Sequence, residues 1–493
     1  MFTCTLLLSS LAALAQGAAL ITRFDINQCL ASSGVPHDVK GSDDWNADSA
    51  AFNIRVPYTP VAIAVPKTTG HIKKAVLCGK KLGIKVSGRS GGHSYANYGL
   101  GGDDAHLVID LSRMHDVTFD DKTNVATVQA GSRLGHMASV LYDKHGRAVA
   151  HGTCPGVGVS GHVGHGGFGF SSHTHGLALD FVVGVTVVLA NGDVVEASET
   201  ENPDLFWAIR GAGSNYGIIA SWRLRTIEAP TTLTYFGVSL GWNYSTAAAG
   251  LNALEQYANH EMPRELNFRV SDYNRGAPGI EGLYYGTEEQ MRAAIDPLLT
   301  KAAPEASFSL SKTVNWIEAV TYYAFNETID WTWPSPRENF YSKSLTLKGL
   351  NGTSAQNFVD YWFTTANKVV DRNWWFQLDM HGGQHSAISQ VSNADTAYAH
   401  RDKLFIIQFY DRVSNDAVYP AVGFSLLDDW ADAVTAPLPT SDWGKYINYA
   451  DANLDQDTAQ RLYYGVNLPR LRELKAKYDP EERFWYPQSI RPV

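Results

Sequence analysis

The fold prediction depends on the stretch Ser87-Gly88-Arg89-Ser90-Gly91-Gly92-His93-Ser94, which continues directly from a predicted strand at residues 84–87. A second glycine-rich stretch covers residues 156–169. Because glycine has no Cβ, its backbone N–H group can approach an anion such as a pyrophosphate closely. Two such loops can enclose one dinucleotide, although flexible turns in a β-rich domain have the same composition. Neither stretch has the Gly-Lys-Ser/Thr of a Walker loop or the placement of a Rossmann fingerprint.

Short strands and helices alternate on both sides of these loops. Residues 69–81 predict a helix because Ile72, Ala75 and Val76 share one face. Asn191-Gly192 between two apolar runs is typical of a two-residue hairpin turn. The pattern predicts strands at residues 61–65, 84–87, 107–111, 126–130, 182–190 and 194–197, a helix at 204–210 and a further glycine loop at 211–217.

The pattern changes after residue 230, where glycine becomes rarer and tryptophan more common. Residues 266–271 alternate apolar and polar side chains as a half-buried strand does, and residues 404–409 also resemble a strand. We expect an antiparallel sheet with helices on one face. Near the C-terminus, the spacing of Leu468, Leu471, Leu474 and Tyr478 predicts a helix. The fold class is therefore α+β, with parts at residues 20–230, 231–445 and 446–493.

Composition excludes several classes of protein. Of the 493 residues, 44% are hydrophobic and 18% are charged, which is typical of a globular protein with a large core. The net charge of −10 disfavours binding to nucleic acid or to anionic membrane surfaces. No run outside the N-terminus reaches the length of a membrane span. We expect a monomer that binds neither nucleic acid nor membrane.

The N-terminus predicts export. Residues 6–14 are mostly apolar and small residues follow, which predicts a signal peptide over residues 1–19, although the usual positive charge is missing. Sequons at Asn243, Asn326 and Asn351 are compatible with N-glycosylation of a secreted, extracellular protein.

The cysteine count adds a constraint on the site. Cys4 lies in the predicted signal peptide, so three cysteines remain in the mature chain. In an oxidising compartment two of them can pair. We predict a disulfide between Cys29 and Cys78, because Cys154 lies in the loop His151-Gly152-Thr153-Cys154-Pro155-Gly156. An unpaired thiol in such a loop requires another explanation.

Histidines in and after the second glycine loop raise the alternative of a metal site. His162 and His165 are followed by His173 and His175, and imidazole suits zinc or copper. No carboxylate occurs among them before Asp180, and dense glycine gives metal ligands a poor frame. We therefore predict no metal.

The chain resembles a family, the secreted flavin oxidases of the vanillyl-alcohol-oxidase fold, in the berberine-bridge-enzyme-like branch. It is most similar to the fungal oligosaccharide oxidases, and the resemblance extends over nearly the whole mature chain. The motifs that carry it are Gly91-Gly92-His93-Ser94-Tyr95, His151-Gly152-Thr153-Cys154-Pro155, Asp204-Leu205-Phe206-Trp207-Ala208-Ile209-Arg210-Gly211 and Asn448-Tyr449-Ala450-Asp451. The resemblance implies a two-part FAD-binding domain at residues 20–230, completed by 446–493, and a substrate-binding domain at 231–445.

The resemblance also implies a bicovalent FAD. His93 would bond the 8α-methyl carbon of the flavin and Cys154 would bond its C6 atom, which agrees with the unpaired thiol. The alternatives are a loop histidine that binds a phosphate and a buried free thiol. The remaining residues that we expect to hold the cofactor are Gly88, Arg89, Ser90, Gly91, Gly92, Ser94, Gly158, Gly161, His162, Gly166 and Gly167.

The catalytic assignment follows from the same resemblance. It implies that Tyr449 is the base, that Asp379 accepts or shares its proton, and that Tyr95 lies near the reacting carbon. A phenol with a pKa near ~10 is a poor base at neutral pH unless such an acceptor is present. A polar residue such as Gln408 in an apolar run is either a satisfied core amide or a substrate contact. The expected sugar contacts are Gln377, Gln408, Trp375, Tyr446, Arg269 and Ser271.

The expected activity is an FAD-dependent oxidation of the reducing-end C1 hydroxyl of oligosaccharides to a lactone, with reduction of O2 to H2O2. One alternative keeps the family and changes the substrate to an alkaloid or another secondary metabolite. A second alternative is a non-enzymatic secreted protein that binds carbohydrate or metal.

Overall fold

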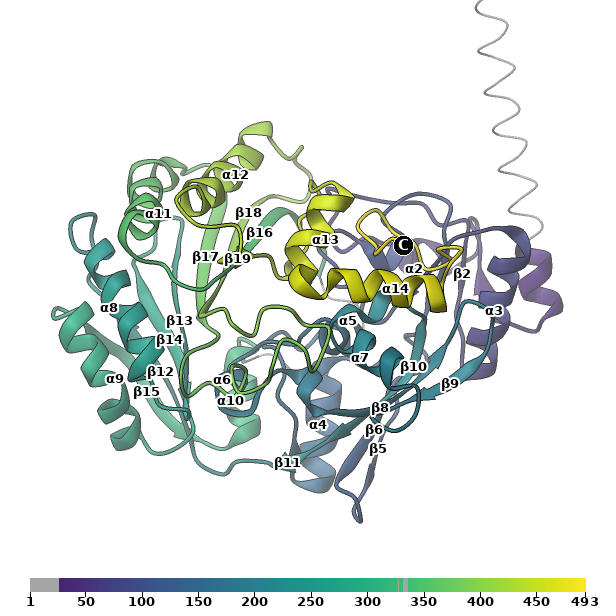
Figure 1. Cartoon of the computed structure of the whole chain (residues 1–493), viewed down its shortest axis with the longest axis horizontal. Helices are drawn as coiled ribbons and strands as arrows, with labels where there is room; N and C mark the ends of the chain where they lie inside the picture. The colour runs from purple at the N-terminus through teal and green to yellow at the C-terminus, as the bar shows by residue number, and fades with distance from the viewer. Residues whose placement is uncertain (1–25, 327, 331–335) are drawn as a thin grey trace, which may run out of the picture.

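The computed structural model describes residues 26–326, 328–330 and 336–493, and these residues form four sheets (Figure 1). The first sheet has the order β1-β2-β4-β3, in which β2, β4 and β3 run parallel and β1 pairs antiparallel with β2. Its elements and the helices between them are β1 (His37–Asp38), α2 (Trp45–Asp48), β2 (Ala62–Ala64), α3 (Thr69–Leu82), β3 (Val86–Arg89) and β4 (Leu107–Asp110). The predicted signal peptide at residues 1–19 lies outside the described residues.

The second sheet is antiparallel and has the order β5-β6-β10-β8-β9. Its strands β8 and β9 pair across Asn191-Gly192, which confirms the predicted hairpin. A separate pair joins β7 and β11. The elements of this region are β5 (Val117–Asp120), β6 (Val125–Gln129), α4 (Leu134–His145), β7 (Arg147–Ala148), α5 (Val159–Gly164), α6 (Ser172–His175), β8 (Val182–Val188), β9 (Val194–Ala197), α7 (Pro203–Ala212), β10 (Ile218–Arg225) and β11 (Ile227–Glu228).

The largest sheet has eight antiparallel strands in the order β15-β12-β14-β13-β17-β18-β16-β19. Figure 1 shows α8, α9, α11 and α12 along its outer face, so the predicted antiparallel sheet with helices on one face is confirmed. Its elements are β12 (Leu233–Ser239), α8 (Ala247–His260), β13 (Leu266–Tyr273), β14 (Gly279–Tyr284), α9 (Glu288–Ala302), β15 (Ser307–Val314), α10 (Trp316–Tyr323), β16 (Asn339–Leu347), α11 (Gly352–Thr364), β17 (Asn373–Met380), β18 (Phe405–Val413), α12 (Ala421–Thr435) and β19 (Trp443–Gly444).

Two apolar cores correspond to these sheets. One lies between the large sheet and its outer helices, and it contains the fully buried side chains of Trp362, Trp374 and Trp430. The other contains the first two sheets together with Leu471 and Phe484 near the C-terminus. The chain thus returns to the first core through α13 (Gln456–Tyr464) and α14 (Leu468–Tyr478). The exact boundaries at residues 230 and 445 stay a prediction.

The local predictions differ from the structure in two places. The strand β13 covers the expected residues 266–271, but Asn267 and Arg269 are buried rather than exposed on a polar face. This strand lies inside the large sheet and its second face is closed by the first half of the chain, as the hydrogen bond from the His173 backbone N–H to Asn267 shows. The glycine loop expected at 211–217 begins within α7, which bends at Gly211 because that residue has a φ of 138°.

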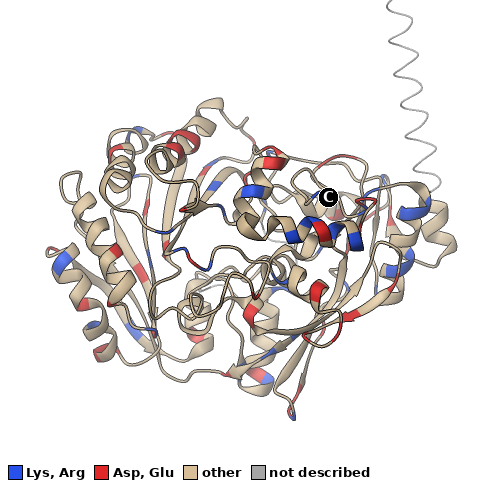
Figure 2. Cartoon of the chain, in the orientation of Figure 1, with Lys and Arg blue, Asp and Glu red and all other residues tan. Residues whose placement is uncertain are grey.

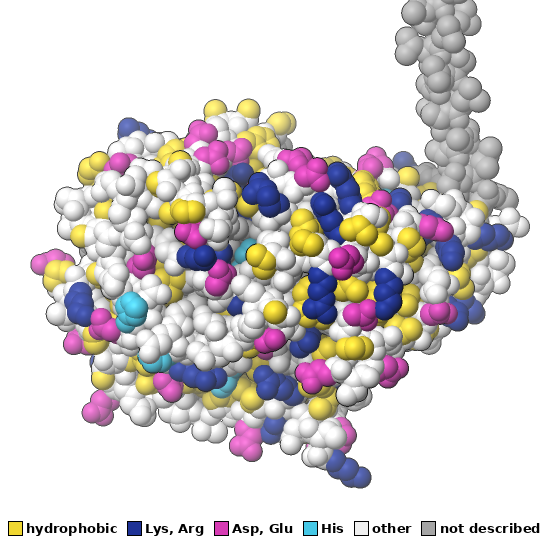
Figure 3. Space-filling view, viewed as in Figure 1, with side chains coloured by type: hydrophobic (Ala, Val, Ile, Leu, Met, Phe, Trp, Pro, Cys, Tyr) yellow, Lys and Arg dark blue, Asp and Glu magenta, His cyan; other side chains and the backbone are white. Residues whose placement is uncertain are grey.

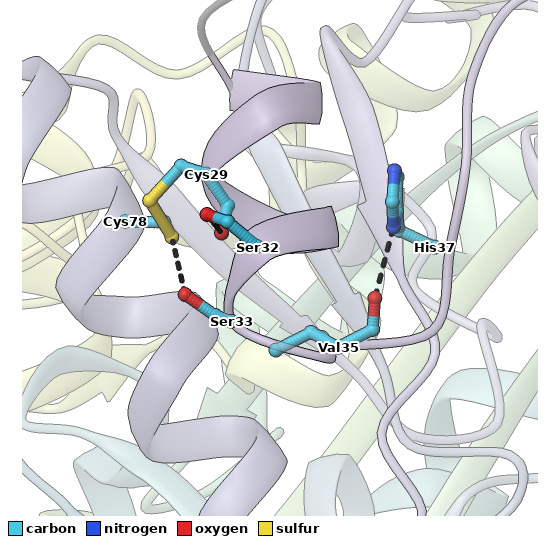
Figure 4. Close-up of a disulfide and its surroundings, with 6 residues drawn as sticks. All are labelled: Cys29, Ser32, Ser33, Val35, His37 and Cys78. Atoms are coloured by element: carbon cyan, nitrogen blue, oxygen red, sulfur yellow. Dashed lines mark hydrogen bonds between the residues drawn. A yellow bond between two sulfur atoms is a disulfide. The ribbon is translucent and has the colours of Figure 1, made fainter.

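The predicted disulfide between Cys29 and Cys78 is confirmed. Their Cα atoms lie 5.8 Å apart, and the bond joins the segment before β1 to α3 (Figure 4). The Ser33 hydroxyl lies 3.8 Å from Cys78 Sγ, and Figure 4 draws this contact as a dashed line. Cys154 is the cysteine that the described part of the chain leaves without a disulfide partner.

Two features of the structure concern the predicted partners. Within the described ranges, no helix has both the length and the apolar composition that a bilayer crossing requires. Lys and Arg positions are interspersed with Asp and Glu positions over the visible elements (Figure 2), and hydrophobic side chains are scattered between charged ones on the face that Figure 3 shows. The three sequon asparagines, Asn243, Asn326 and Asn351, are exposed, while Glu327 of the second sequon lies outside the described residues. Their glycosylation stays a prediction.

Candidate active site

A cavity of about 1420 Å³ lies between the two glycine loops and the inner face of the large sheet. It exceeds the range of roughly 300–1,000 Å³ that holds a drug-sized ligand, so it has room for a dinucleotide and a substrate. We call its two sides the loop wall, formed by residues 86–95 and 152–162, and the sheet wall, formed by the cavity-facing residues of β13, β17 and β18 together with Tyr449. The sequence-predicted residues that line the loop wall are Gly88, Arg89, Ser90, Gly91, Gly92, His93, Ser94, Cys154, Gly158, Gly161 and His162.

The two glycine loops touch each other. A Cβ on Gly91 would lie 2.3 Å from the Gly158 nitrogen, and a Cβ on Gly158 would lie 2.0 Å from the Gly91 nitrogen. The Ser90 hydroxyl donates to the Ala130 carbonyl at 2.6 Å and accepts from the Ser160 N–H at 3.4 Å. At the end of β3, Arg89 pairs with the buried carboxylate of Asp110, with Nε donating at 2.6 Å. The contact between the loops therefore requires glycine at positions 91 and 158, since a side chain at either position would separate the loops.

His93 lies in the loop wall with its ring centroid 3.9 Å from that of Phe52. Burial, and to a smaller extent the charge of Arg133, lower the pKa of His93 to about 4. The imidazole is therefore neutral at neutral pH, and one ring nitrogen has a free lone pair. This state suits a histidine that forms a bond to carbon.

Cys154 lies in the same wall, and its thiol is exposed to the cavity rather than to open solvent. Because protein surrounds it on the other sides, burial raises the pKa of the thiol above its usual value. The loop before it is held by His162, whose Nε2 accepts from the Gly152 N–H at 2.9 Å. An unpaired thiol and a neutral imidazole in one cavity fit the two attachment points of a flavin.

Two expected cofactor residues do not line this cavity. Gly166 and Gly167 lie behind the loop wall, where a Cβ on Gly166 would lie 3.0 Å from the Tyr446 ring and a Cβ on Gly167 would lie 2.4 Å from Ala178. Both have positive φ, 126° and 83°, so they turn the chain rather than contact a ligand. The sequence pattern did not separate these turn glycines from the contact glycines, because both kinds occur in one run.

Two histidines of the second loop make hydrogen bonds within the protein. Among the described residues, no group of three His, Cys, Asp or Glu side chains could hold a metal ion. The His162 Nε2 accepts a hydrogen bond from the Gly152 N–H, and the His165 Nε2 lies 3.0 Å from the Ser214 hydroxyl. Burial lowers the pKa of both imidazoles. They act as neutral hydrogen-bonding groups that shape the loop.

Tyr449 reaches the cavity from the short helix Ile447–Tyr449, which precedes α13. Its ring stacks against that of Tyr95 at 5.9 Å, with 19° between the planes, and Tyr446 approaches its edge at 5.1 Å. Burial, and then the charge of Asp379, raise the pKa of the phenol well above its usual value. The phenol is thus protonated at neutral pH and needs an acceptor before it can remove another proton.

Asp379 lies on β17 with 1% of its surface exposed. Its Oδ1 accepts from Arg269 Nε at 2.9 Å, because these two residues lie opposite each other on β17 and β13. Burial raises the pKa of the Asp379 carboxyl, and the Arg269 cation opposes this shift. Its Oδ2 has no hydrogen-bond partner among the described residues. Among the described residues, the expected hydrogen bond between Asp379 and Tyr449 is not present. The catalytic roles of both residues stay predictions.

Three polar side chains form a row across the sheet wall. Ser271 lies opposite Gln377, and Gln377 lies opposite Gln408 on the next strand. All three line the cavity, and Gln408 donates to the Tyr95 hydroxyl at 2.9 Å. Beside this row, Trp375 stacks on Tyr410 at 4.6 Å with 9° between the rings. Hydrogen-bonding groups and an aromatic face therefore border one space.

Arg269 and Tyr446 have contacts that change their expected roles. Arg269 lines the cavity, but it is held by Asp379 and lies 4.3 Å above the Phe170 ring. The Tyr446 hydroxyl accepts from the N–H groups of Gly167 at 2.9 Å and Phe168 at 3.2 Å, and from Asn448 Nδ2 at 2.9 Å. Through these bonds Tyr446 holds the second glycine loop, although it also lines the cavity, and its expected sugar contact stays a prediction.

Two groups of residues were missed at the sequence level. Arg133 joins both glycine loops, and Lys343 and Lys445 surround the buried carboxylate of Asp451, at 2.9 Å and 3.7 Å. Asp451 belongs to the motif that carries Tyr449, so it anchors the segment immediately after that residue. Gly131 and Gly135 flank Arg133, but only the structure shows that neither has room for a Cβ. Nothing in the sequence pattern indicated the two lysines.

Comparison with known proteins places this geometry in context. A family model described as "FAD binding domain" matches residues 60–198, and one described as "Berberine and berberine like" matches residues 445–491. A carbohydrate oxidase from Microdochium nivale is 57% identical over 481 residues, which are 97% of this chain and 97% of that protein. A crystal structure of that oxidase with a substrate analogue covers 95% of this chain and 100% of its own, with a TM-score of 0.94.

Two further relatives are informative. A xylooligosaccharide oxidase from Thermothelomyces thermophilus is 49% identical over 478 residues, covering 96% of this chain and 95% of that protein. A structure of the glucooligosaccharide oxidase from Acremonium strictum is 43% identical with a TM-score of 0.93, and it covers 95% of this chain and 99% of that one. That glucooligosaccharide oxidase carries a 6-S-cysteinyl, 8α-N1-histidyl FAD.

Proposed function

The chain belongs to the berberine-like family of FAD-dependent carbohydrate oxidases, and on this premise we propose that it oxidises the reducing-end C1 hydroxyl of oligosaccharides to a lactone. The electron pair passes to O2, which is reduced to H2O2, and water opens the lactone to the aldonic acid. The observation that carries this proposal is the polar row of Ser271, Gln377 and Gln408 beside Tyr449. Amides and hydroxyls suit a substrate that is rich in hydroxyl groups better than an apolar alkaloid.

The residues of the loop wall fit an FAD that is attached twice. His93, neutral because its pKa is lowered to about 4, would bond the 8α carbon, and the unpaired Cys154 would bond C6. The backbone N–H groups of the touching glycine loops would bind the pyrophosphate. When bound, FAD supplies the acceptor for the hydride that leaves the C1 carbon.

Tyr449 removes the proton of the C1 hydroxyl in this proposal. Its own proton needs an acceptor, and the Asp379 carboxylate has an oxygen, Oδ2, that no described residue uses. Arg269 fixes the other oxygen of that carboxylate and opposes the rise that burial causes in its pKa. Since the charge of Asp379 already acts on the buried phenol, a small movement of Tyr449 on substrate binding would bring its proton to this acceptor.

The sheet wall positions the sugar. Trp375, supported by the parallel ring of Tyr410, offers an apolar face on which a pyranose ring can stack. Gln377 and Ser271 offer donors and acceptors to its hydroxyls, and Gln408 orients the Tyr95 hydroxyl toward the space beside Tyr449. A pyranose stacked on Trp375 would thus have its C1 hydroxyl against the base.

The setting that we propose is extracellular. The disulfide Cys29–Cys78 is compatible with an oxidising compartment, and the sequons at Asn243 and Asn351 lie on exposed turns. We expect a secreted, glycosylated monomer.

Two measurements on the purified protein test the proposal. Xylo-, cello- and chito-oligosaccharides are offered in air, and both H2O2 and the aldonic acid are quantified. Equal amounts of the two products with at least one sugar series support the proposal, whereas peroxide with an alkaloid alone would sink it. In parallel, acid-precipitated protein is washed and digested, and the flavopeptide is sequenced. A flavin that washes out would exclude covalent attachment.

A further inference from the structure

Arg133, the residue that immediately precedes α4, lies between the two loops that carry the proposed attachment residues. Only 5% of its surface is exposed. Its Nη1 atom donates to the carbonyl of Gly91 at 2.8 Å and also to the carbonyl of Gly156. Gly91 lies two residues before His93, and Gly156 lies two residues after Cys154. One nitrogen atom therefore connects both loops close to the side chains that would bond the flavin.

The backbone on either side of Arg133 fixes where its side chain begins. Leu134 N–H donates to the Val157 carbonyl at 2.9 Å, and Gly135 N–H donates to the Pro155 carbonyl at 3.0 Å. Arg133 itself forms an isolated antiparallel bridge with Gly158. The segment thus runs along the cysteine loop, and the guanidinium extends from there to the histidine loop.

The charge of Arg133 has no partner in an ion pair among the described residues, which is unusual for a buried side chain. Burial lowers its pKa to about 10, so it stays protonated at neutral pH. The Asp110 carboxylate favours the charged form, and Nη1 of the guanidinium donates to the two loop carbonyl groups.

We propose that Arg133 is a positioning residue for covalent attachment, holding His93 and Cys154 at the separation at which both can bond one flavin ring system. This inference rests on the proposed bicovalent FAD. In each attachment the side chain loses its N–H or S–H proton, one hydrogen of the ring system leaves as a proton, and a C–N or C–S bond forms. The electron pair released passes to O2, which yields H2O2 with the two protons.

The same cation also acts on the chemistry of His93. It is the charged group that lowers the pKa of this imidazole in addition to burial. The other neighbours are uncharged at neutral pH: the Phe52 ring carries no charge, and burial raises the pKa of both the Tyr95 phenol and the Cys154 thiol. Arg133 thereby helps to keep the lone pair of His93 free.

The test compares Arg133→Met with the unaltered protein and with a matched control. Each holoprotein is purified and digested, and mass spectrometry measures the flavin that is joined to both the His93 and the Cys154 peptides. We expect the ratio of singly to doubly attached flavin to rise about tenfold or more, because a misplacement of the order of 1 Å can cost that much. Arg483→Met is the control, since Arg483 Nη1 also donates to two carbonyls, those of Gly79 and Ile84, neither of which lies in the loop wall. That variant should keep the unaltered ratio.

The outcomes separate the proposed attachment from the role of Arg133. If the unaltered protein itself has no doubly attached flavin, the proposed bicovalent attachment fails and the inference falls with it, while the oligosaccharide assay still tests the oxidation. If the unaltered protein is doubly attached and Arg133→Met is equally so, Arg133 is not a positioning residue. If Arg133→Met does not fold, Arg133→Lys takes its place, because it keeps the charge and can reach one carbonyl. We expect its ratio to lie above that of the unaltered protein, and an unaltered ratio would overturn the inference.

Discussion

The loop wall and the sheet wall of the cavity present different chemistry to a ligand. The loop wall presents mainly backbone groups, and its shape depends on close contacts such as that between Gly91 and Gly158. The sheet wall presents side chains, and the pairing of β13, β17 and β18 brings Ser271, Gln377 and Gln408 into one row. A backbone site tolerates no added atoms, whereas a side-chain site tolerates changes of shape and depends on a few chemical groups. Variants in the two walls should therefore fail in different ways.

The largest expected effect lies in the sheet wall. Tyr449→Phe removes the proposed base while leaving the ring that stacks on Tyr95. We expect turnover to fall by about 10²–10⁴-fold, with flavin content and unfolding temperature unchanged. Tyr216→Phe is the control, because its buried hydroxyl donates only to the Leu471 carbonyl, far from the cavity. Stopped-flow measurement of flavin reduction provides the readout, and near-normal reduction in Tyr449→Phe would remove this residue as the base.

The next effect lies in the loop wall and concerns stability and cofactor content together. Gly158→Ala places a Cβ 2.0 Å from the Gly91 nitrogen, so the loops must separate. We expect a loss of about 1–3 kcal/mol in the free energy of unfolding and a loss of bound flavin. Gly161→Ala is matched to it, since Gly161 also lines the cavity but has no atom within 4 Å of an added Cβ. Equal yellow colour per mole of protein in both variants would contradict the proposed contact between the loops.

Asp379→Asn should change the pH dependence of the reaction. Burial raises the pKa of the carboxyl, so the unaltered enzyme should lose kcat/KM as the pH falls through that raised value and the carboxylate becomes protonated. In the variant we expect this acid limb to vanish. Turnover at neutral pH should fall about tenfold, which is the factor that corresponds to one pKa unit of proton affinity.

Asp411→Asn is the control for this pH profile. Asp411 is also a buried carboxylate with a raised pKa and an arginine partner, Arg372, but it does not line the cavity. Its variant should retain the acid limb. If Asp379→Asn retained the limb as well, Asp379 would not be the proton acceptor.

The smallest effect tests the link between the two walls. Tyr446 lies next to the sheet wall, but its hydroxyl holds the Gly167 and Phe168 N–H groups behind the loop wall. Tyr446→Phe should lower the free energy of unfolding by about 1 kcal/mol and leave the KM for oligosaccharides within twofold of the original value. Chemical denaturation and initial-rate kinetics are the measurements. A large rise in KM with unchanged stability would restore Tyr446 as a sugar contact.

The elements that could be predicted from the sequence are those that depend on local chemistry. The helix at 69–81 was predictable because its apolar face is continuous, and Thr68 and Gly83 end it by ordinary capping. The hairpin at Asn191-Gly192 follows from its turn residues. The disulfide followed from counting cysteines, since the third cysteine lies in a loop of another kind. Each of these inferences uses residues close together in the chain or a choice among very few partners.

The candidate site was predictable only in part. His93, Cys154 and Tyr449 occur in dense local motifs, and the structure brings all three to one cavity. Arg133, Lys343 and Lys445 were missed because an isolated arginine or lysine looks like a solvated surface residue in the sequence. Gly166 and Gly167 were assigned to the cofactor because the sequence does not distinguish a glycine that contacts a ligand from one that turns the chain.

The sequence by itself determined the α+β fold class, the pairing of Cys29 with Cys78, the family and its FAD, because these depend on local motifs, on residue counts and on resemblance over nearly the whole chain. Only the tertiary structure decided that Arg269 pairs with Asp379, that Ser271, Gln377 and Gln408 form one row, and that one atom of Arg133 joins the two glycine loops. The physical reason is strand register and chain crossing. These contacts join residues from about 23 to 110 positions apart, as in Arg133 with Gly156 and Arg269 with Asp379, and their formation depends on how whole elements pack.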